Sequence, residues 1–277
     1  STQCGWFAPC TIRGKGRITS TNMNNLTEQQ LVDFHRDGFV GVNGLVETSL
    51  VERIVQYTDR AVAQEAGPAE YEADLGYPGS PVSRNGSGGR TIRRLLKACG
   101  RDPAFTDLAT HPDILVRLRQ LLGEELVLPL AHHNCIMVKA PRYGTATGWH
   151  QDVRYWRFQR PELVTVLLAL NDATETNGCL QFIPGSHTLT PKPEQLDEAE
   201  FIRVDLPENQ PLIERAVPIV MAAGDVVFFH CRTFHAAGSN NGEETRKSVL
   251  FTYRSSDNPP LAQTRSSSSP ELMLHVQ

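Results

Sequence analysis

After Glu125 the sequence consists of short apolar runs separated by residues typical of turns. The runs that we expect to form strands are 126–139, 149–155, 162–170, 179–184, 216–221, 225–230 and 246–253. The turn residues between them are Pro141, Asn177-Gly178, Pro184-Gly185, Gly224-Asp225 and Asn240-Asn241-Gly242. Many short strands at such intervals predict a β-sandwich or a barrel.

The first third of the chain has a different pattern, which is typical of helices. Thr27 and Gln30 fit a capping box that opens a short helix, and the apolar spacing from Leu50 to Ala66 fits an amphipathic helix. We also predict helices over about 91–99 and 112–122, and a short strand over 38–42. The expected fold is mainly β with α elements, a double-stranded β-helix (a cupin-like jelly roll) on which N-terminal helices pack.

The first 22 residues and the rest of the sequence lead to different expectations. Residues 1–22 are polar and lack a period, so we expect a disordered extension or a remnant that is not native, with an ordered arm as the alternative. Residues 23–277 contain no visible repeat or interdomain linker. They are therefore expected to form one domain.

Composition excludes several classes of partner. The formal net charge is -4 and no long run of Lys or Arg occurs, so we expect no nucleic-acid partner. No apolar run approaches the roughly 18 residues of a membrane span, so we expect no membrane contact. The six cysteines are scattered and the N-terminus lacks an apolar segment, which favours a reducing, cytoplasmic setting. The sequence does not indicate an oligomeric state.

His150 and Asp152 stand two positions apart in a predicted strand, so their side chains point to the same face. They are either a solvated polar pair or two ligands of a metal. A third ligand would come from elsewhere, and both His230 and His235 lie near a late predicted strand.

A predicted hairpin favours His235. With the turn at 238–243 centred between Asn240 and Asn241, His235 is expected to lie opposite Arg246. A histidine beside an arginine makes sense if the histidine binds a metal and the arginine binds a carboxylate of a ligand that chelates it. Two histidines and one carboxylate leave positions open, as in non-haem Fe(II) oxygenases, whereas zinc is more often closed off by four ligands.

Several motifs resemble the phytanoyl-CoA dioxygenase family of Fe(II)- and 2-oxoglutarate-dependent oxygenases. The motifs are WHQD (149–152), NGCLQFIPGSH (177–187), GDVVFFH (224–230), FHAAGSN leading to RKS (234–248), and the stretch 91–125. The resemblance extends from about residue 26 to residue 254.

The resemblance implies roles for individual residues. His150, Asp152 and His235 would be the Fe(II) ligands, and Arg246 would bind the distal carboxylate of 2-oxoglutarate. His230 would not be a ligand. A carboxylate at 152 argues for oxygenation, because halogenating relatives lack it. The sequence departs from the family at Ala237, where relatives carry a serine.

The strand before the first motif carries further candidates. Alternation places His133, Cys135 and Met137 on one face, which the resemblance turns toward the cofactor. His133 and Cys135 are candidates to contact 2-oxoglutarate, and Met137 and Trp156 to line the substrate pocket. The alternative for each is an ordinary core residue. Arg90, Arg93, Arg94 and Lys97 are expected to form a basic face of a helix, either solvated or in contact with an acidic ligand.

The function expected from these residues is that of an Fe(II)- and 2-oxoglutarate-dependent dioxygenase. It would use O2 to hydroxylate an unactivated C–H bond of a small molecule (a metabolite, amino acid or lipid-like compound) and release succinate and CO2. The alternatives are a cupin-type metal dioxygenase without 2-oxoglutarate, desaturation, epimerisation or cyclisation with the same cofactors, and a silent binding module. Substrate contacts are expected in the loops 76–90 and 188–212.

Overall fold

The computed structural model describes residues 24–274, so the predictions for residues 1–22 lie outside the described part. Two antiparallel sheets form the body of the fold. The large sheet contains β1 (Phe39–Val42), β2 (Ala69–Tyr71), β3 (Ile92–Leu96), β4 (Leu126–Pro129), β5 (Asn134–Lys139), β7 (Leu163–Ala169), β10 (Val226–His230), β12 (Arg246–Ser255) and β13 (Glu271–Leu274). The small sheet contains β6 (Thr147–His150), β8 (Leu180–Phe182), β9 (Val217–Pro218) and β11 (His235–Ala237).

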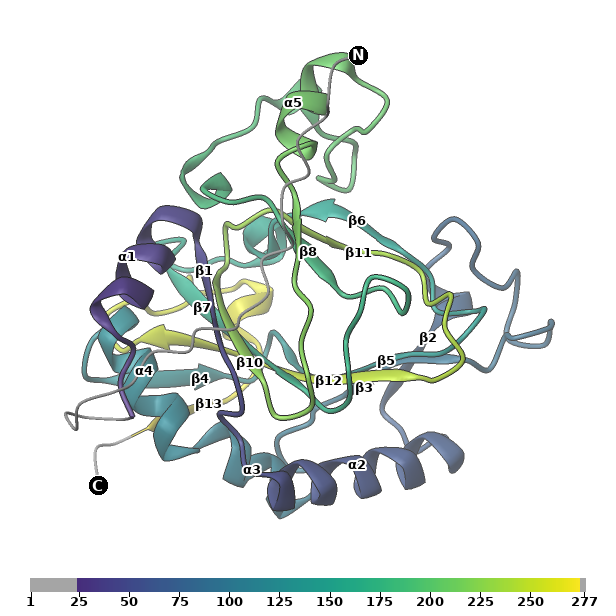
Figure 1. Cartoon of the computed structure of the whole chain (residues 1–277), viewed down its shortest axis with the longest axis horizontal. Coiled ribbons are helices and arrows are strands. Elements are labelled where there is room, and N and C mark those ends of the chain that lie inside the picture. Colours follow the sequence, from purple (N-terminus) through teal and green to yellow (C-terminus); the bar gives the residue numbers. More distant parts are fainter. Residues whose placement is uncertain (1–23, 275–277) are drawn as a thin grey trace, which may run out of the picture.

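The helices pack outside these sheets. They are α1 (Glu28–Asp37), α2 (Thr48–Ala63), α3 (Pro103–Ala109), α4 (Pro112–Leu122) and the short α5 (Gln210–Ile213). In Figure 1, α2 and α3 run along the bottom of the large sheet, and α5 lies in a protruding segment at the top. Within residues 24–274, no helix is long and apolar enough to cross a bilayer.

The boundaries of α1 follow from its sequence. The backbone N–H of Gln30 donates to Thr27 Oγ1 (3.2 Å), and the N–H of Thr27 donates to Gln30 Oε1 (2.9 Å), so the predicted capping box is confirmed. Gly38 ends the helix with a φ of 86°, a left-handed conformation that glycine adopts readily. The predicted helices that became α2 and α4 and the predicted strand that became β1 are also confirmed.

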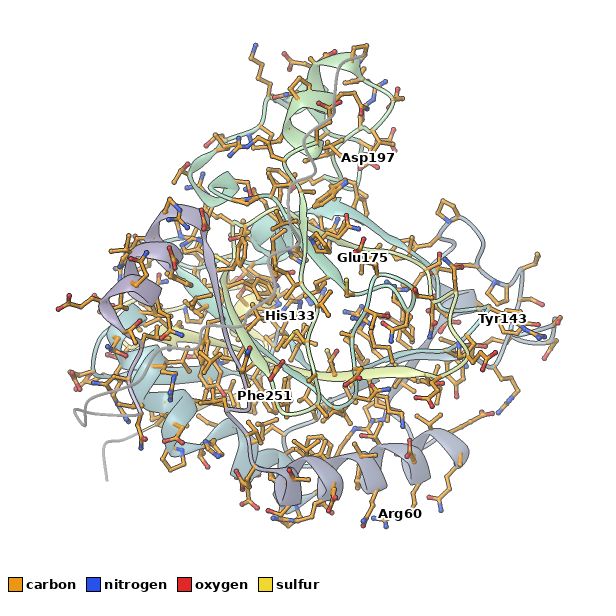
Figure 2. The ribbon with its side chains drawn as sticks, in the orientation of Figure 1. Arg60, His133, Tyr143, Glu175, Asp197 and Phe251 are labelled. Atoms are coloured by element: carbon orange, nitrogen blue, oxygen red, sulfur yellow. The ribbon has the colours of Figure 1, made fainter. Side chains whose placement is uncertain are left out.

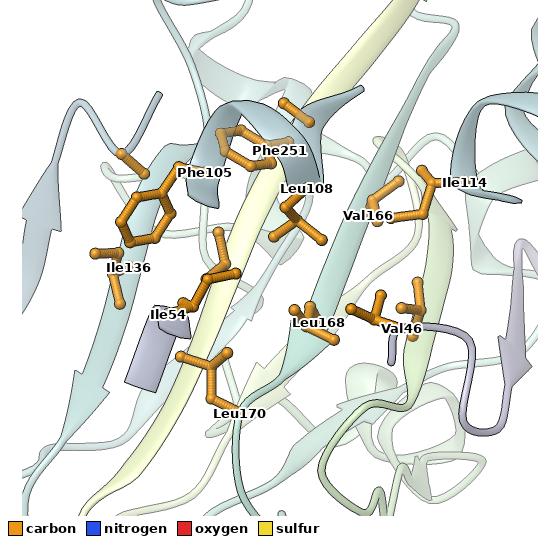
Figure 3. Close-up of a cluster of buried hydrophobic side chains, with 14 of the residues drawn as sticks. Val46, Ile54, Phe105, Leu108, Ile114, Ile136, Val166, Leu168, Leu170 and Phe251 are labelled. Atoms are coloured by element: carbon orange, nitrogen blue, oxygen red, sulfur yellow. The ribbon is translucent and has the colours of Figure 1, made fainter. Parts of the chain in front are cut away.

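The main apolar core lies between the large sheet and the helices. Phe251 of β12 and Val166 and Leu168 of β7 face the helices, where they meet Leu108 and Ile114 (Figure 3). A second cluster lies on the other face of the same strands, between the two sheets, and includes Leu250, Leu167, Phe182 and Phe229. The large sheet is therefore covered on both faces, as expected for a jelly roll.

The structure overturns the predicted helix over 91–99. Residues 92–96 form β3, in which Leu95 pairs with Ile136 of β5 and Ala69 of β2. The apolar positions in this short segment fit a helix or a strand, and pairing with two distant strands decided the outcome. Arg93 and Arg94 consequently lie on a strand and not on a helical face. The sequence analysis also missed α3, whose N-cap is Asp102.

Several predicted strands are shorter than expected: 179–184 is reduced to β8 and 216–221 to β9, and two others bear on the site. The run 126–139 is interrupted between β4 and β5, where His133 has a φ of 35°. The run 149–155 ends as a strand at His150, and a short 3₁₀ helix (Asp152–Tyr155) follows. The alternation that placed Asp152 and Trp156 on the face of His150 therefore does not apply. The segment 76–90 contains no helix or strand, as predicted.

Candidate metal centre and its cavity

Two histidines face each other across the small sheet. β6 and β11 are antiparallel neighbours, and their register sets His150 directly opposite His235, with ring centroids 4.2 Å apart. Asp152, at the start of the 3₁₀ helix after β6, brings its Oδ1 to 3.8 Å from His150 Nε2 and 3.6 Å from His235 Nε2. All three potential ligand atoms lie within 4.8 Å of one another, a group that could hold a metal ion.

Each histidine ring is oriented by the backbone carbonyl two residues before it. His150 Nδ1 lies 2.8 Å from the carbonyl oxygen of Gly148, and His235 Nδ1 lies 2.9 Å from that of Thr233. A carbonyl oxygen only accepts, so Nδ1 carries the proton in both rings and Nε2 keeps its lone pair. Burial also lowers the pKa of His150 well below its usual value. The Nε2 atoms of both rings are therefore oriented as donors for a divalent metal.

The carboxylate of Asp152 is buried without full compensation. Its side chain is 4% exposed, and Oδ2 has no hydrogen-bond partner within residues 24–274. Removing a carboxylate oxygen from water in this way is costly unless a cation or a donor meets it. The triad thus has the ligand types, the orientation and the uncompensated charge that fit a metal with open coordination positions.

His133 lies directly behind this carboxylate. Its Nε2 is 3.3 Å from Asp152 Oδ1, and its Nδ1 is 3.4 Å from the hydroxyl of Thr165. Trp156 packs edge-on against the ring, with centroids 5.0 Å apart. Figure 2 shows His133 near the middle of the molecule, whereas Asp197 lies in the protruding segment. The contact with Asp152 was not expected from the sequence.

All eight candidate site residues line one cavity of about 600 Å³ between the two sheets. They are His133, Cys135, Met137, His150, Asp152, Trp156, His235 and Arg246. His230 is not among the lining residues; its ring packs on that of His187. Trp156 lines the cavity although it does not lie on the strand of His150, where the sequence analysis had placed it.

The hairpin that was expected to pair His235 with Arg246 does not exist. β11 and β12 belong to different sheets, and Arg246 lies opposite Lys139 of β5. The connecting loop is bound to the end of β5, where Asn240 Nδ2 donates to the carbonyl oxygen of Lys139 (2.7 Å). The two sheets face each other, and this arrangement brings both residues to the same cavity.

Arg246 is a buried cation. Its exposed fraction is 6%, and its Nε has no hydrogen-bond partner in the described part of the chain. No carboxylate of residues 24–274 lies within ion-pair distance of it. Burial, together with the neighbouring charge of Arg93, lowers the pKa of Arg246 to about 10. Such a group favours an anionic ligand.

The sequence analysis missed the buried charges of Lys139 and Glu72, and it named Arg93 but expected it on a helix. Lys139 is 3% exposed, its Nζ donates to the carbonyl oxygen of Thr145 (2.9 Å), and burial lowers its pKa to about 7. Arg93 forms a buried ion pair with Glu72 (3.1 Å) and donates to Thr147 Oγ1 (2.6 Å). The only sequence signal for Lys139 is its position at the end of an apolar run; Glu72 gives none.

Comparison with known proteins agrees with this geometry. The family model for phytanoyl-CoA dioxygenase (PhyH) matches residues 34–248, which is most of the chain. The chain belongs to the phytanoyl-CoA dioxygenase family. Its fold is that of the family's Fe(II)/2-oxoglutarate oxygenases, so the predicted jelly roll is confirmed.

Individual relatives support the same assignment. The chain is 27% identical to an ectoine dioxygenase of Bordetella bronchiseptica (89% of this chain, 80% of the relative) and 25% identical to the peroxisomal phytanoyl-CoA dioxygenase of Mus musculus (91% and 75%). Among solved structures, the epimerase SnoN in complex with Fe3+, alpha ketoglutarate and nogalamycin RO matches with a TM-score of 0.67 and 25% identity (84% of this chain, 85% of that chain). The chain is accordingly an iron- and 2-oxoglutarate-dependent oxygenase of the non-haem class. This argues against the alternatives of a cupin-type enzyme without 2-oxoglutarate and of a silent binding module.

Proposed function

We propose that this protein hydroxylates an unactivated C–H bond of a small molecule, consuming O2 and 2-oxoglutarate and releasing succinate and CO2. In this proposal His150, Asp152 and His235 are the ligands of Fe(II), and Arg246 binds the distal carboxylate of 2-oxoglutarate. One observation carries it: a buried His-Asp-His group and a buried unpaired arginine line the same cavity.

The chain's own residues would hold the cofactors in a fixed arrangement. The Nδ1 protons of His150 and His235 stay on backbone carbonyls, so neither ring can rotate away from the metal. Asp152 contributes a negative charge that offsets part of the metal charge. Iron and 2-oxoglutarate, when bound, supply the oxidising power for O2 activation. The protein contributes the positioning of the reactants, and its buried ligands lie away from bulk solvent.

The remaining candidates receive supporting roles. His133 Nε2, at 3.3 Å from Asp152 Oδ1, would fix the carboxylate ligand, and the Cys135 thiol would border the bound 2-oxoglutarate. Met137 and Trp156 would form walls of the substrate pocket. Ala237 offers no hydroxyl, so Arg246 would hold the distal carboxylate without that additional donor.

Anaerobic titration of the Fe(II)-loaded protein with 2-oxoglutarate tests these assignments without a substrate. Chelation of the metal by the keto acid should produce a visible absorption band. His150→Ala and His235→Ala should lose it because a ligand is missing. Arg246→Met should weaken the apparent affinity for 2-oxoglutarate by about tenfold to a hundredfold, the effect of losing a charge-assisted hydrogen bond.

His230→Gln provides the matched control. His230 is a largely buried histidine of β10 outside the cavity lining, so this variant should retain the band and the wild-type affinity. A band that survives in His235→Ala and disappears in His230→Gln would show that His230, and not His235, is the metal ligand. An unchanged affinity in Arg246→Met would remove Arg246 from its role.

Epimerisation is the second candidate, because the matching structure SnoN is an epimerase. Mass spectrometry of the product separates the two reactions. Hydroxylation adds one oxygen atom to the substrate, whereas epimerisation leaves its mass unchanged.

A further inference from the structure

The outer part of the cavity carries positive charges that no carboxylate compensates. We call Lys97, Arg154 and Arg265 the basic rim. Lys97 follows β3, Arg154 lies in the 3₁₀ helix after β6, and Arg265 begins a 3₁₀ helix (Arg265–Ser267) near the C-terminus. All three line the cavity. Within residues 24–274, none of them has a carboxylate at ion-pair distance.

The deeper charges of the cavity are matched by carboxylates or backbone carbonyls, or would be matched by the cofactors. Lys139 Nζ donates to the carbonyl oxygens of Thr145 (2.9 Å) and Gly238. Two of its arginines have carboxylate partners, Arg93 with Glu72 (3.1 Å) and Arg94 with Glu70 (2.7 Å). In the proposed function, the metal compensates Asp152 and the distal carboxylate of 2-oxoglutarate compensates Arg246. The charge of the basic rim is therefore left for another ligand.

The segment that carries Arg265 is firmly attached to the cavity wall. Ser266 is fully buried; its hydroxyl lies 2.7 Å from His132 Nε2 and accepts the backbone N–H of Arg157 (2.8 Å). Ser268 and Ser269 of the same segment also line the cavity and add hydroxyl groups beside Arg265.

Arg154 is held from another side. Its guanidinium lies 4.0 Å from the centre of the Phe201 ring, and one of its amino groups donates to the carbonyl oxygen of Ala199 (2.9 Å). The guanidinium also lies 4.6 Å from the centre of the Tyr155 ring. None of these contacts neutralises its charge. The acidic residues of the adjoining loop (Asp197, Glu198 and Glu200) are not among the cavity lining.

Apolar side chains line the same cavity alongside these charges. They include Leu75, Tyr77, Leu96, Leu130, Tyr155 and Trp156. A ligand that uses both surfaces has an anionic group and an apolar body. Arginine forks suit a carboxylate or a phosphate group, and apolar walls suit a carbon skeleton.

We propose that the substrate is an amphipathic anion, whose carboxylate or phosphate group binds at the basic rim while its apolar part lies along the cavity. This inference rests on the proposed function, because it assigns Asp152 and Arg246 to the cofactors. The ion pair at the rim fixes which carbon of the substrate reaches the metal centre. Arg154 and Arg265 are thus specificity-determining residues.

Matched probes test the proposal on the protein loaded with Fe(II) and saturating 2-oxoglutarate under anaerobic conditions. The probes are 2-naphthoate and 2-naphthamide, which differ in charge and share one apolar body, and binding is measured by calorimetry. The wild type should bind the naphthoate about tenfold more tightly, as expected for a charge-assisted contact that is partly exposed. This preference should fall as NaCl is added.

Substitutions test which residues produce the preference for naphthoate over naphthamide. Arg265→Gln and Arg154→Gln should each reduce it by about threefold, and the double variant should abolish it. Arg160→Gln is the control, because Arg160 is a partly exposed arginine outside the cavity lining, paired with Glu162 and Asp257. A third probe, 2-naphthyl phosphate, distinguishes the two anions: tighter binding than the naphthoate indicates a phosphate ester, and weaker binding a carboxylic acid.

The outcomes separate this proposal from the proposed function. Equal binding of naphthoate and naphthamide by the wild type would contradict the proposal that the basic rim binds an anionic group. A preference that survives in the double variant would contradict it as well. The absorption band of the Fe(II)–2-oxoglutarate complex, recorded on the same samples, reports the proposed function independently. If the band forms but the anionic probe is not preferred, only the proposal of an anionic substrate is contradicted. If the band is missing, the assignment of the cofactor ligands is contradicted.

Discussion

The two faces of β12 meet opposite surroundings. Val249, Phe251 and Tyr253 point toward the helices and belong to the main apolar core. Arg246, Ser248 and Leu250 line the cavity between the sheets. The helix side is apolar and closely packed, whereas the cavity side holds polar atoms without partners. One strand therefore separates the residues that stabilise the fold from those that serve the reaction.

The largest effect is expected on the cavity side. Asp152→Ala should lower 2-oxoglutarate turnover by more than about a thousandfold, because a lost metal ligand removes several kcal/mol of transition-state stabilisation. The metal-free variant should be at least as stable as the wild type, since the change removes a buried carboxylate with an unpaired oxygen. Turnover and urea unfolding of the metal-free protein measure the two effects. A large loss of stability would contradict the separation of the faces.

The helix side should show the opposite behaviour. Phe251→Ala leaves a cavity in the main core, because Phe251 is 1% exposed, and should lower the free energy of unfolding by about 3–5 kcal/mol. The fraction that stays folded should still form the Fe(II)–2-oxoglutarate absorption band with wild-type affinity for 2-oxoglutarate. Loss of that affinity at a temperature where the variant is folded would show that the two faces are coupled.

Acid should destabilise the cavity side. Burial lowers the pKa of His132 to about 3, and the unfolded chain keeps the usual value near 6.5. The unfolded state therefore binds the proton first, so stability is present above about pH 6.5 and falls as the pH decreases toward 3. His132→Asn should flatten the loss between pH 6.5 and 4.5 by about 1–2 kcal/mol. Equal pH slopes in urea unfolding of both proteins would refute this.

The smallest effect is expected where β12 meets α3. The hydroxyl of Tyr253 donates to the carbonyl oxygen of Ala109 (2.9 Å) at the end of that helix. Tyr253→Phe keeps the packing and removes the hydrogen bond, so it should cost about 1 kcal/mol of unfolding free energy. Urea unfolding measures it, and 2-oxoglutarate affinity should not change. A cost comparable to that of Phe251→Ala would mean that the bond organises the core.

The sequence predicted which residues meet in the candidate metal centre, but the hairpin used to select one of them was wrong. His150 and Asp152 stand close together in the chain, so their spacing carried a local signal. His235 was selected with a hairpin that the structure does not contain, and the family resemblance supplied the same residue independently. Local spacing cannot reveal that β11 and β12 join different sheets, because pairing with β6, β8 and β5 involves residues far away in the sequence.

The same limit explains the missed residues. Residues 92–96 fit a helix or a strand when taken alone, and contacts with β5 and β2 made them β3. The network of Glu72, Arg93 and Thr147 joins three separate segments, and its members look like surface residues in the sequence. The alternation that placed Cys135 and Met137 on the cavity side was reliable, because it depends only on the geometry of one strand.

The backbone carbonyls that hold His150 and His235 have a consequence for how this protein can change. Each ring is anchored two residues before itself, on Gly148 and Thr233. The orientation of the two imidazoles is thus set by backbone next to them in the chain, and the Phe201 ring of the loop 188–212 adds one packing contact to His150 (centroids 5.5 Å apart). The loops expected to contact the substrate contribute little to the cavity: Tyr77 is the one lining residue of 76–90, and the lining contains no residue of 188–212. Substitutions at the basic rim, and not exchange of those loops, would therefore be the natural way to redirect the protein to a new compound.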